Sequence, residues 1–285
     1  MSSQDRSQAR DRVPGPGLST DAAGWHRVRT VMDKEWAEIK RNRAILWMMA
    51  LLPLLLVAMV LGTDYFIIRA EAKGQDTDAD EMPVPEQLKH LPPVEAFLVQ
   101  MNEQYMFYLF LIPMMLPVYI AAYSIVGEKQ TRTLEPLLAT PVTTEELLAA
   151  KAIAATVPAV LLTWLSFAVM LLGLRLVAPP SVFFYGSRPV WILAMLILSP
   201  LLAFLSVLCG VIASSRINDP RTAQQVMGIF VVPIIALSLV VLAGKIFVNV
   251  QMVLYAAGVT LLVDVAALYL AVKVFQRETI LTRWK

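Results

Sequence analysis

Six long runs of apolar residues alternate with polar segments along the chain, at residues 44–63, 105–126, 147–174, 190–213, 226–244 and 250–272. An α-helix needs about 20 apolar residues to cross the roughly 30 Å hydrocarbon core of a bilayer. Each run meets or approaches that length. The pattern therefore predicts an all-α polytopic membrane protein, whose transmembrane domain at residues 44–272 contains six transmembrane helices.

The polar segments between and around these runs differ in character. Residues 1–24 are polar and rich in proline and glycine, which predicts a disordered tail. Residues 64–104 are acidic and interrupted by prolines, which favours a long external loop with a short helix at residues 94–102. Residues 127–143 form a short charged segment between two apolar runs, and residues 273–285 form a basic tail.

Residues 25–43, just before the first apolar run, have the pattern of an amphipathic helix. Val28, Met32, Trp36 and Ile39 recur at three- and four-residue steps and so share one helical face. Most of the other positions are charged, with an excess of lysine and arginine. Such a helix suits the membrane interface, and we expect an elbow helix that leads into the first span.

The distribution of basic residues predicts the orientation. Of the 24 lysines and arginines, the predicted external segments hold Arg69, Lys73, Lys89, Arg175, Arg188 and Lys245, and the predicted internal segments hold the rest. Cytoplasmic segments of membrane proteins carry the excess of positive charge. Six spans with both termini in the cytoplasm satisfy this rule.

The composition excludes several classes of function for this chain alone. It contains one cysteine, Cys209, and two histidines, His26 and His90, far apart and outside the apolar runs. These residues offer neither a cysteine-based metal cluster nor a histidine base beside a nucleophile. No G-x-x-x-x-G-K-[ST] motif occurs, so we expect no ATPase site, no catalytic residue and no bound metal in this chain.

One acidic residue, Asp264, lies well inside an apolar run. An ionisable group inside the membrane costs several kcal/mol unless it is paired or hydrated, and it is therefore a candidate functional residue. It could line an ion or proton path, or it could form a structural hydrogen bond to a neighbouring helix. The sequence leaves both interpretations open.

Residues 127–143 have the features of a compact lever between the second and third spans. Glu128 and Arg132 are four residues apart, which supports a short helix, and Pro136 interrupts it. Thr143 and Glu146 have the spacing of a capping box, which predicts that a new helix starts there. A rigid segment of this kind could receive a push from a cytoplasmic motor.

The sequence from 128 to 151, E-K-Q-T-R-T-L-E-P-L-L-A-T-P-V-T-T-E-E-L-L-A-A-K, resembles the signature of ABC-2-type transporter permeases. Residues 214–225, S-S-R-I-N-D-P-R-T-A-Q-Q, are similar to the second cytoplasmic loop of these permeases, and residues 275–284 to their C-terminus. The likeness extends over nearly the whole chain after the first two dozen residues. Within the family, the chain looks most like sodium- or drug-exporting permeases.

This resemblance implies the six-helix ABC-2 permease fold, with a cytoplasmic coupling helix at residues 128–140 docked on a separate ABC ATPase subunit that binds ATP and Mg²⁺. The residues it places at the ATPase are Glu128, Lys129, Arg132, Leu134, Glu135, Leu137 and Leu138. Those in the second cytoplasmic loop are Arg216, Asp219 and Arg221. It also implies a second permease copy, identical or a sibling. The length of the external loop suggests an accessory protein outside, and we expect no nucleic-acid partner.

The resulting hypothesis is a multi-pass permease subunit of an ATP-driven exporter in a prokaryotic plasma (inner) membrane, surrounded by lipid. The apolar character of the spans favours an amphipathic, lipid-like, drug or ion substrate. One alternative is a secondary transporter driven by an ion gradient through Asp264. The other is a membrane anchor subunit that transports nothing.

Overall fold

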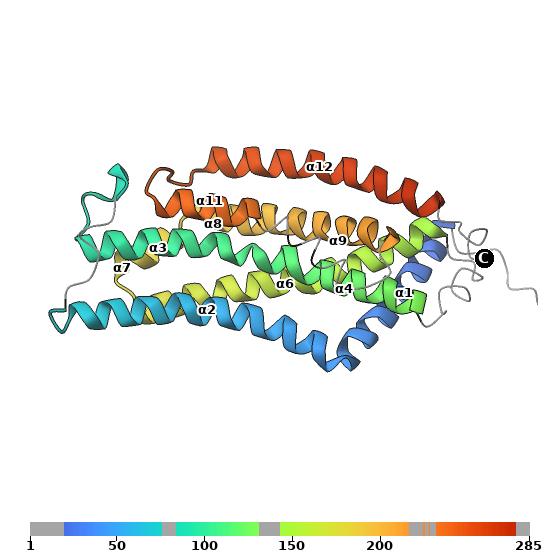
Figure 1. Ribbon diagram of the computed structural model, residues 1–285, viewed down its shortest axis with the longest axis horizontal. Coiled ribbons are helices and arrows are strands. Elements are labelled where there is room, and N and C mark those ends of the chain that lie inside the picture. The colour runs from blue at the N-terminus through green and yellow to red at the C-terminus, as the bar shows by residue number, and fades with distance from the viewer. Residues whose placement is uncertain are drawn as a thin grey trace, which may run out of the picture.

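The computed structural model describes residues 20–75, 84–130, 143–216, 225, 228 and 232–277, and its elements in this part are helices (Figure 1). The first half contains α1 (Thr20–Arg41), α2 (Arg43–Glu71), η2 (Glu86–Leu88), α3 (Pro93–Leu109) and α4 (Leu111–Gln130). The second half contains α6 (Thr144–Val177), α7 (Pro180–Gly186), α8 (Pro189–Leu193), η3 (Ala194–Leu198), α9 (Ser199–Arg216), α11 (Val232–Leu242) and α12 (Val250–Arg277).

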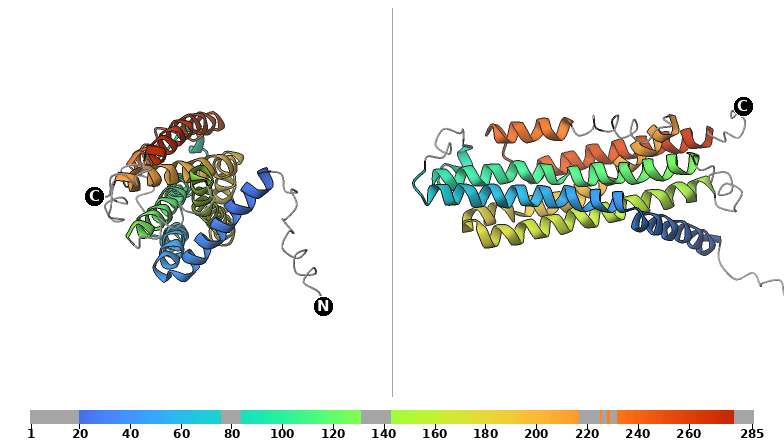
Figure 2. Two further views of the ribbon diagram at one scale, coloured as in Figure 1. Left: turned by 90° about the vertical axis from the view of Figure 1, so that its right-hand side faces the viewer. Right: turned by 60° about the horizontal axis from the view of Figure 1, so that its bottom comes forward.

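The long helices run side by side along an elongated bundle, with α12 and α2 on opposite flanks in Figure 1. In the interior, α4 packs against α9 and α6, and α12 lies on α9. The end of α4 and the start of α6 lie at the same end of the bundle as α1, which is inclined to the long helices (Figure 2). We call this the α1 end, and the opposite end, where α7 lies, the α7 end.

Five helical stretches in the described part are long and apolar enough to cross a membrane. They are Arg43–Glu71, Pro93–Ala121, Glu146–Val177, Pro180–Ala213 and Val250–Lys273. The shorter apolar helix α11 is the described part of the predicted span at residues 226–244. The all-helical, membrane-spanning class is therefore confirmed, and the sixth span stays a prediction.

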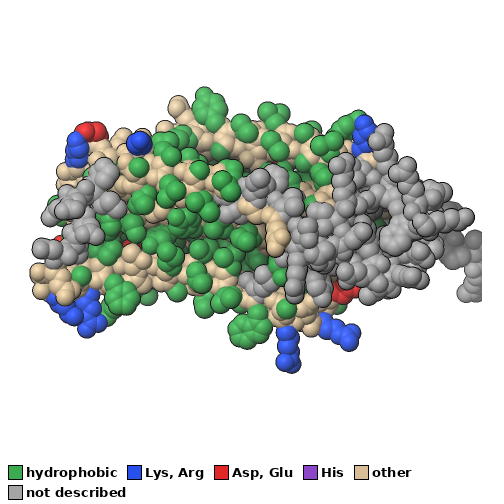
Figure 3. All heavy atoms as spheres, viewed as in Figure 1, with side chains coloured by type: hydrophobic (Ala, Val, Ile, Leu, Met, Phe, Trp, Pro, Cys, Tyr) green, Lys and Arg blue, Asp and Glu red, His purple; other side chains and the backbone are tan. Residues whose placement is uncertain are grey.

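The outer surface of the flanking helices is apolar, as expected for contact with lipid. Trp47 and Leu54 on α2 are 72% and 70% exposed, and Tyr255 and Leu262 on α12 are 75% and 72% exposed. Hydrophobic side chains cover the middle of the face in Figure 3, whereas lysines and arginines lie towards its two ends. This distribution matches a bilayer around the middle of the bundle.

Two helices at the α7 end extend beyond the spans predicted from the apolar runs. An external loop with a short helix at residues 94–102 was expected at residues 64–104, whereas α2 continues to Glu71 and α3 runs from Pro93 to Leu109. The polar residues that suggested a loop, among them Asp64, Asn102 and Glu103, are buried inside the bundle. Their polar partners inside the bundle, described below, stabilise them within helices at positions where hydropathy alone indicates a loop.

Prolines explain several local features. The break between α3 and α4 lies at Phe110, where Pro113 has no N–H to donate to the carbonyl of Leu109. In the π-helical turn η3, the N–H of Ser199 bonds to the carbonyl of Ala194, and Pro200 has no N–H to offer the next carbonyl, that of Met195. The indole of Trp164 on α6 donates to Met195 instead, at 2.8 Å. A neighbouring helix thus satisfies the freed group, as membrane helices require.

Candidate functional site

The structure describes only part of the predicted coupling segment. Glu128 and Lys129 lie in the last turn of α4, and Arg216 is the last residue of α9. The remaining predicted site residues lie outside the described residues; they are Arg132, Leu134, Glu135, Leu137, Leu138, Asp219 and Arg221. The structure does define the two helices that carry the coupling segment, because α4 ends at Gln130 and α6 begins at Thr144.

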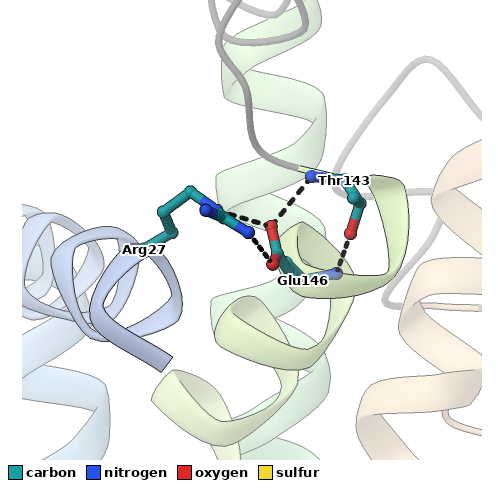
Figure 4. A network of polar contacts seen from close by, with 3 residues as sticks. All are labelled: Arg27, Thr143 and Glu146. Atoms are coloured by element: carbon teal, nitrogen blue, oxygen red, sulfur yellow. Dashed lines mark hydrogen bonds and ion pairs between the residues drawn. The ribbon is translucent and has the colours of Figure 1, made fainter. Parts of the chain in front are cut away.

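The first turn of α6 is fixed by a capping box and by α1. The Thr143 hydroxyl accepts a hydrogen bond from the Glu146 N–H at 3.2 Å, and Glu146 accepts one from the Thr143 N–H at 3.0 Å. The predicted capping box is therefore confirmed. Arg27 of α1 donates to both oxygens of the same carboxylate, at 2.6 and 3.1 Å (Figure 4). This hydrogen bond raises the pKa of the Arg27 guanidinium.

One turn further along, a buried ion pair joins α1 to α6. The Lys151 Nζ lies 2.7 Å from the Glu35 carboxylate, and the two side chains are 2% and 4% exposed. The same ammonium donates to the Ser124 hydroxyl of α4 at 2.5 Å. A buried charge without partners is strongly unfavourable, so Lys151 holds α1 and α4 against α6 at one point.

A third contact forms where Pro158 interrupts the hydrogen bonds of α6. Proline has no N–H, so the carbonyl of Ala154, four residues earlier, has no helical donor. The indole of Trp36 on α1 donates to this carbonyl at 3.1 Å. Around it, Val28, Val31 and Met32 of α1 pack with apolar residues of α6 in one buried cluster.

These contacts define the α1–α4–α6 joint, made of Arg27, Glu35, Trp36, Ser124, Glu146, Lys151 and the apolar cluster around them. It lies at the end of the bundle where the chain leaves α4 and returns in α6. Its polar atoms are engaged in holding helices together, so the arrangement suits the transmission of movement. The predicted apolar face of α1 thus packs largely on α6, and its place in the membrane interface stays a prediction.

Sequence reasoning missed most of this joint. From the sequence, Lys151 was used only as one of the basic residues that predict the membrane orientation. No contact was predicted for Arg27, Glu35, Trp36 or Ser124. One signal was available: Pro158 in an apolar helix predicts an unpaired carbonyl at Ala154, which needs a donor from elsewhere. Nothing in the sequence indicates that Trp36 supplies it.

A second group of buried polar side chains lies on α3 near the α7 end. The Asn102 amide donates to both oxygens of Asp64 on α2, at 3.0 Å each. Glu103 pairs with Arg188, whose guanidinium lies 4.1 Å from the centre of the Phe247 ring. Gln100 donates to the carbonyl of Leu242 at the end of α11. These contacts attach α3 to α2 in the first half of the chain, and to Arg188 and α11 in the second half.

Asp264, the predicted intramembrane site, lies on α12 with its side chain turned into the bundle. The residue is 3% exposed, and neither carboxylate oxygen has a hydrogen-bond partner among the described residues. It lies close enough to Cys209 of α9 for an electrostatic interaction with the thiol. The expected hydrogen bond to a neighbouring helix is therefore not found within the described residues.

A model of the ABC-2 family transporter proteins matches residues 68–252, which is more than half of the chain. The chain belongs to the ABC-2 family of transporter proteins. No curated protein matches it. The match includes the coupling segment and α6 but leaves out α1, most of α2, and the part of α12 that carries Asp264.

Membership of the ABC-2 family makes this chain a membrane permease of an ABC transporter. Permeases of this family have no ATPase site of their own and generally work with a separate ATP-binding subunit. The apolar helices agree with a multi-pass membrane location. The resemblance in the sequence is thus confirmed at the level of the family, while the sodium- or drug-exporting subgroup stays a prediction.

Proposed function

We propose that this ABC-2 permease is the membrane subunit of an ATP-driven exporter, and that residues 128–140 receive the movement of a separate ATPase. The observation that carries the proposal is the α1–α4–α6 joint. The two helices that flank the coupling segment are held to each other and to α1 by Lys151, which contacts both Glu35 and Ser124.

In this mechanism, closure of the ATPase displaces residues 128–140, and the joint makes the ends of α4 and α6 move together. Helix α6 continues to Val177 at the α7 end. It lies against α2, α4 and α9 on the way. A displacement at the α1 end therefore reaches the helices that would open or close a path. Charged residues Glu128, Lys129, Arg132 and Glu135 set the choice of ATPase.

The orientation places the α1 end in the cytoplasm, with both termini on that side of a prokaryotic plasma membrane. The excess of lysine and arginine in the segments at this end supports it. The permease pairs with a second copy of itself or with a sibling. ATP and Mg²⁺ bind to the partner ATPase, and the substrate is an amphipathic, lipid-like, drug or ionic molecule.

The direct test is purification from the native membrane in mild detergent, followed by mass spectrometry and an ATP turnover assay. We expect a P-loop ATPase in near-equal amount and turnover that vanadate inhibits. Reversal of both charges at Arg132 and Glu135, by Arg132→Glu with Glu135→Arg, should abolish stimulation of the ATPase while the permease stays in the membrane. A chain that purifies without an ATPase, or full stimulation in the reversed variant, contradicts the proposal.

A second candidate function rests on the unpaired carboxylate of Asp264. A secondary transporter would use this group to couple an ion gradient to transport. It would then transport in vesicles that contain no ATPase, and Asp264→Asn would abolish that transport. A membrane anchor, in contrast, would show no transport in either assay.

A further inference from the structure

Within the part of the chain that the structure describes, helix α12 meets the bundle along a narrow face. Its buried residues are Val253, Ala257, Asp264, Ala267 and Ala271, which recur at three-, four- and seven-residue steps. Most of the intervening positions are exposed. We call this face the α12 seam. Within the described residues, the seam contacts mainly α9, with smaller contacts to α6, α8 and η3.

Asp264 is the only acidic residue in this seam, and no described group satisfies its oxygens. Its neighbours along the seam are alanines and other small or apolar residues. A carboxylate in such surroundings is unfavourable unless a positive group comes to it. The Asp64 carboxylate near the α7 end is also buried, but it has Asn102 as a partner. The contrast marks Asp264 as a group whose partner is absent from the described part of the protein.

An apolar cavity of about 70 Å³ lies on the same seam, nearer the α7 end. Its walls include three aromatic side chains and part of α12; the residues concerned are Phe107, Phe110, Trp191, Met252, Val253 and Ala256. Ala256 and Asp264 are separated by roughly 12 Å along α12 at 1.5 Å per residue. The cavity reaches the seam at Val253, on the buried face of α12 that also carries the unpaired carboxylate.

The unpaired carboxylate and the apolar cavity together indicate the class of ligand that could bind here. A metal ion that loses its water needs several oxygen ligands from the protein, and no cluster of three acidic, histidine or cysteine residues that could hold one occurs in the part of the chain that the structure describes. An organic cation instead needs one counter-charge and an apolar surface for its body. Aromatic rings add attraction for a cation that approaches their faces.

We propose that the α12 seam binds an organic cation with an apolar body, its charge at Asp264 and its body directed towards the cavity beside Phe107, Phe110 and Trp191. The proposal rests on the proposed function, for which it names a class of substrate. Entry from the bilayer past α12 fits the exposed apolar surface of that helix.

The test is direct binding of tetraphenylphosphonium to the full chain in lipid nanodiscs, which requires no ATPase. We expect saturable binding that Asp264→Asn weakens about tenfold or more, because a buried charge pair is lost. Asp264→Glu should keep most of the affinity. Asp64→Asn is the matched control, since it neutralises a buried acid outside the seam, and we expect its affinity to stay within about twofold of the wild type.

The single cysteine of the chain supplies a second measurement that needs no variant. Because Cys209 lies close enough to Asp264 for an electrostatic interaction, tetraphenylphosphonium bound at Asp264 should slow modification of this thiol by a small maleimide. Should the Asp264→Asn chain fail to fold, this protection still decides the matter. Equal rates with and without saturating tetraphenylphosphonium would overturn the proposal.

The outcomes separate this proposal from the proposed function. Binding that is unchanged in Asp264→Asn, or a chain that binds only Na⁺, overturns the organic-cation site and leaves an ATP-driven permease intact. Binding that depends on Asp264, in a chain that purifies without any ATPase, supports the site and contradicts the exporter. Binding and vanadate-sensitive turnover together support both.

Discussion

The indole of Trp36 on α1 donates a hydrogen bond to the Ala154 carbonyl of α6, which Pro158 leaves without its helical donor. The proline thus leaves a polar group of α6 without its helical partner, and the amphipathic helix α1 supplies the donor. The contact attaches α1 to a defined turn of α6, one turn beyond the buried Lys151. The joint beside the coupling segment is therefore specified by particular atoms as well as by apolar packing.

Trp36→Phe should destabilise the permease through this contact. The buried Ala154 carbonyl loses its donor, at a cost of about 1–3 kcal/mol, which thermal unfolding in detergent would register as a lower midpoint. Pro158→Ala restores the N–H of residue 158 and should make Trp36→Phe nearly harmless. A Trp36→Phe effect of equal size in both backgrounds would show that the hydrogen bond is not the cause.

The buried ion pair predicts different effects for one substitution and for two. Glu35→Gln removes a buried carboxylate that pairs with Lys151, which should cost about 3–5 kcal/mol. Replacing both partners, by Glu35→Leu with Lys151→Met, should recover most of that stability because apolar pairs pack without the cost of desolvation. Thermal unfolding of the two proteins provides the measurement.

The control for this pair lies on the same helix. Glu38 forms an exposed pair with Lys34 at 3.4 Å, and Glu38→Gln should change stability by less than about 1 kcal/mol. A Glu38→Gln protein as unstable as Glu35→Gln would mean that burial of the Lys151 pair has no special role.

Helices α2 and α6 approach each other closely at Gly173. A methyl group there would overlap the side chain of Leu61, so Gly173→Ala should cost about 1–3 kcal/mol through overpacking. The neighbouring Gly62 has open space around it, and Gly62→Ala should be neutral or slightly stabilising. Leu61→Ala introduced together with Gly173→Ala should recover part of the loss, and the opposite order of stabilities would contradict the packing.

The sequence predicted those parts of the fold that depend on local rules. Apolar runs located the membrane helices, and the spacing of Thr143 and Glu146 located the start of α6. The full length of α3 was not predicted, because hydropathy counts the polar residues Asn102 and Glu103 as loop residues. Inside the bundle, Asp64 and Arg188, which are distant in sequence, satisfy them. Pairings between helices decide such cases, and one sequence does not display them.

The same distinction between local patterns and contacts of distant residues applies to the candidate site. The motif around residues 128–151 was sufficient to indicate the ABC-2 family, and it named the coupling segment. The joint that supports the segment depends on Arg27, Glu35 and Trp36, which lie more than a hundred residues earlier in the chain. Their partners become evident only when α1 is placed against α6.

Photocrosslinking in the native membrane tests the central claim, that residues 128–140 receive the ATPase. A photoreactive amino acid at Leu134 should form an adduct with a P-loop ATPase, and the same amino acid at the exposed Glu86, at the α7 end, should form none. This result would place the coupling segment at the motor and the α1 end in the cytoplasm. An ATPase adduct from Glu86, or none from Leu134 although the ATPase co-purifies, would contradict the account.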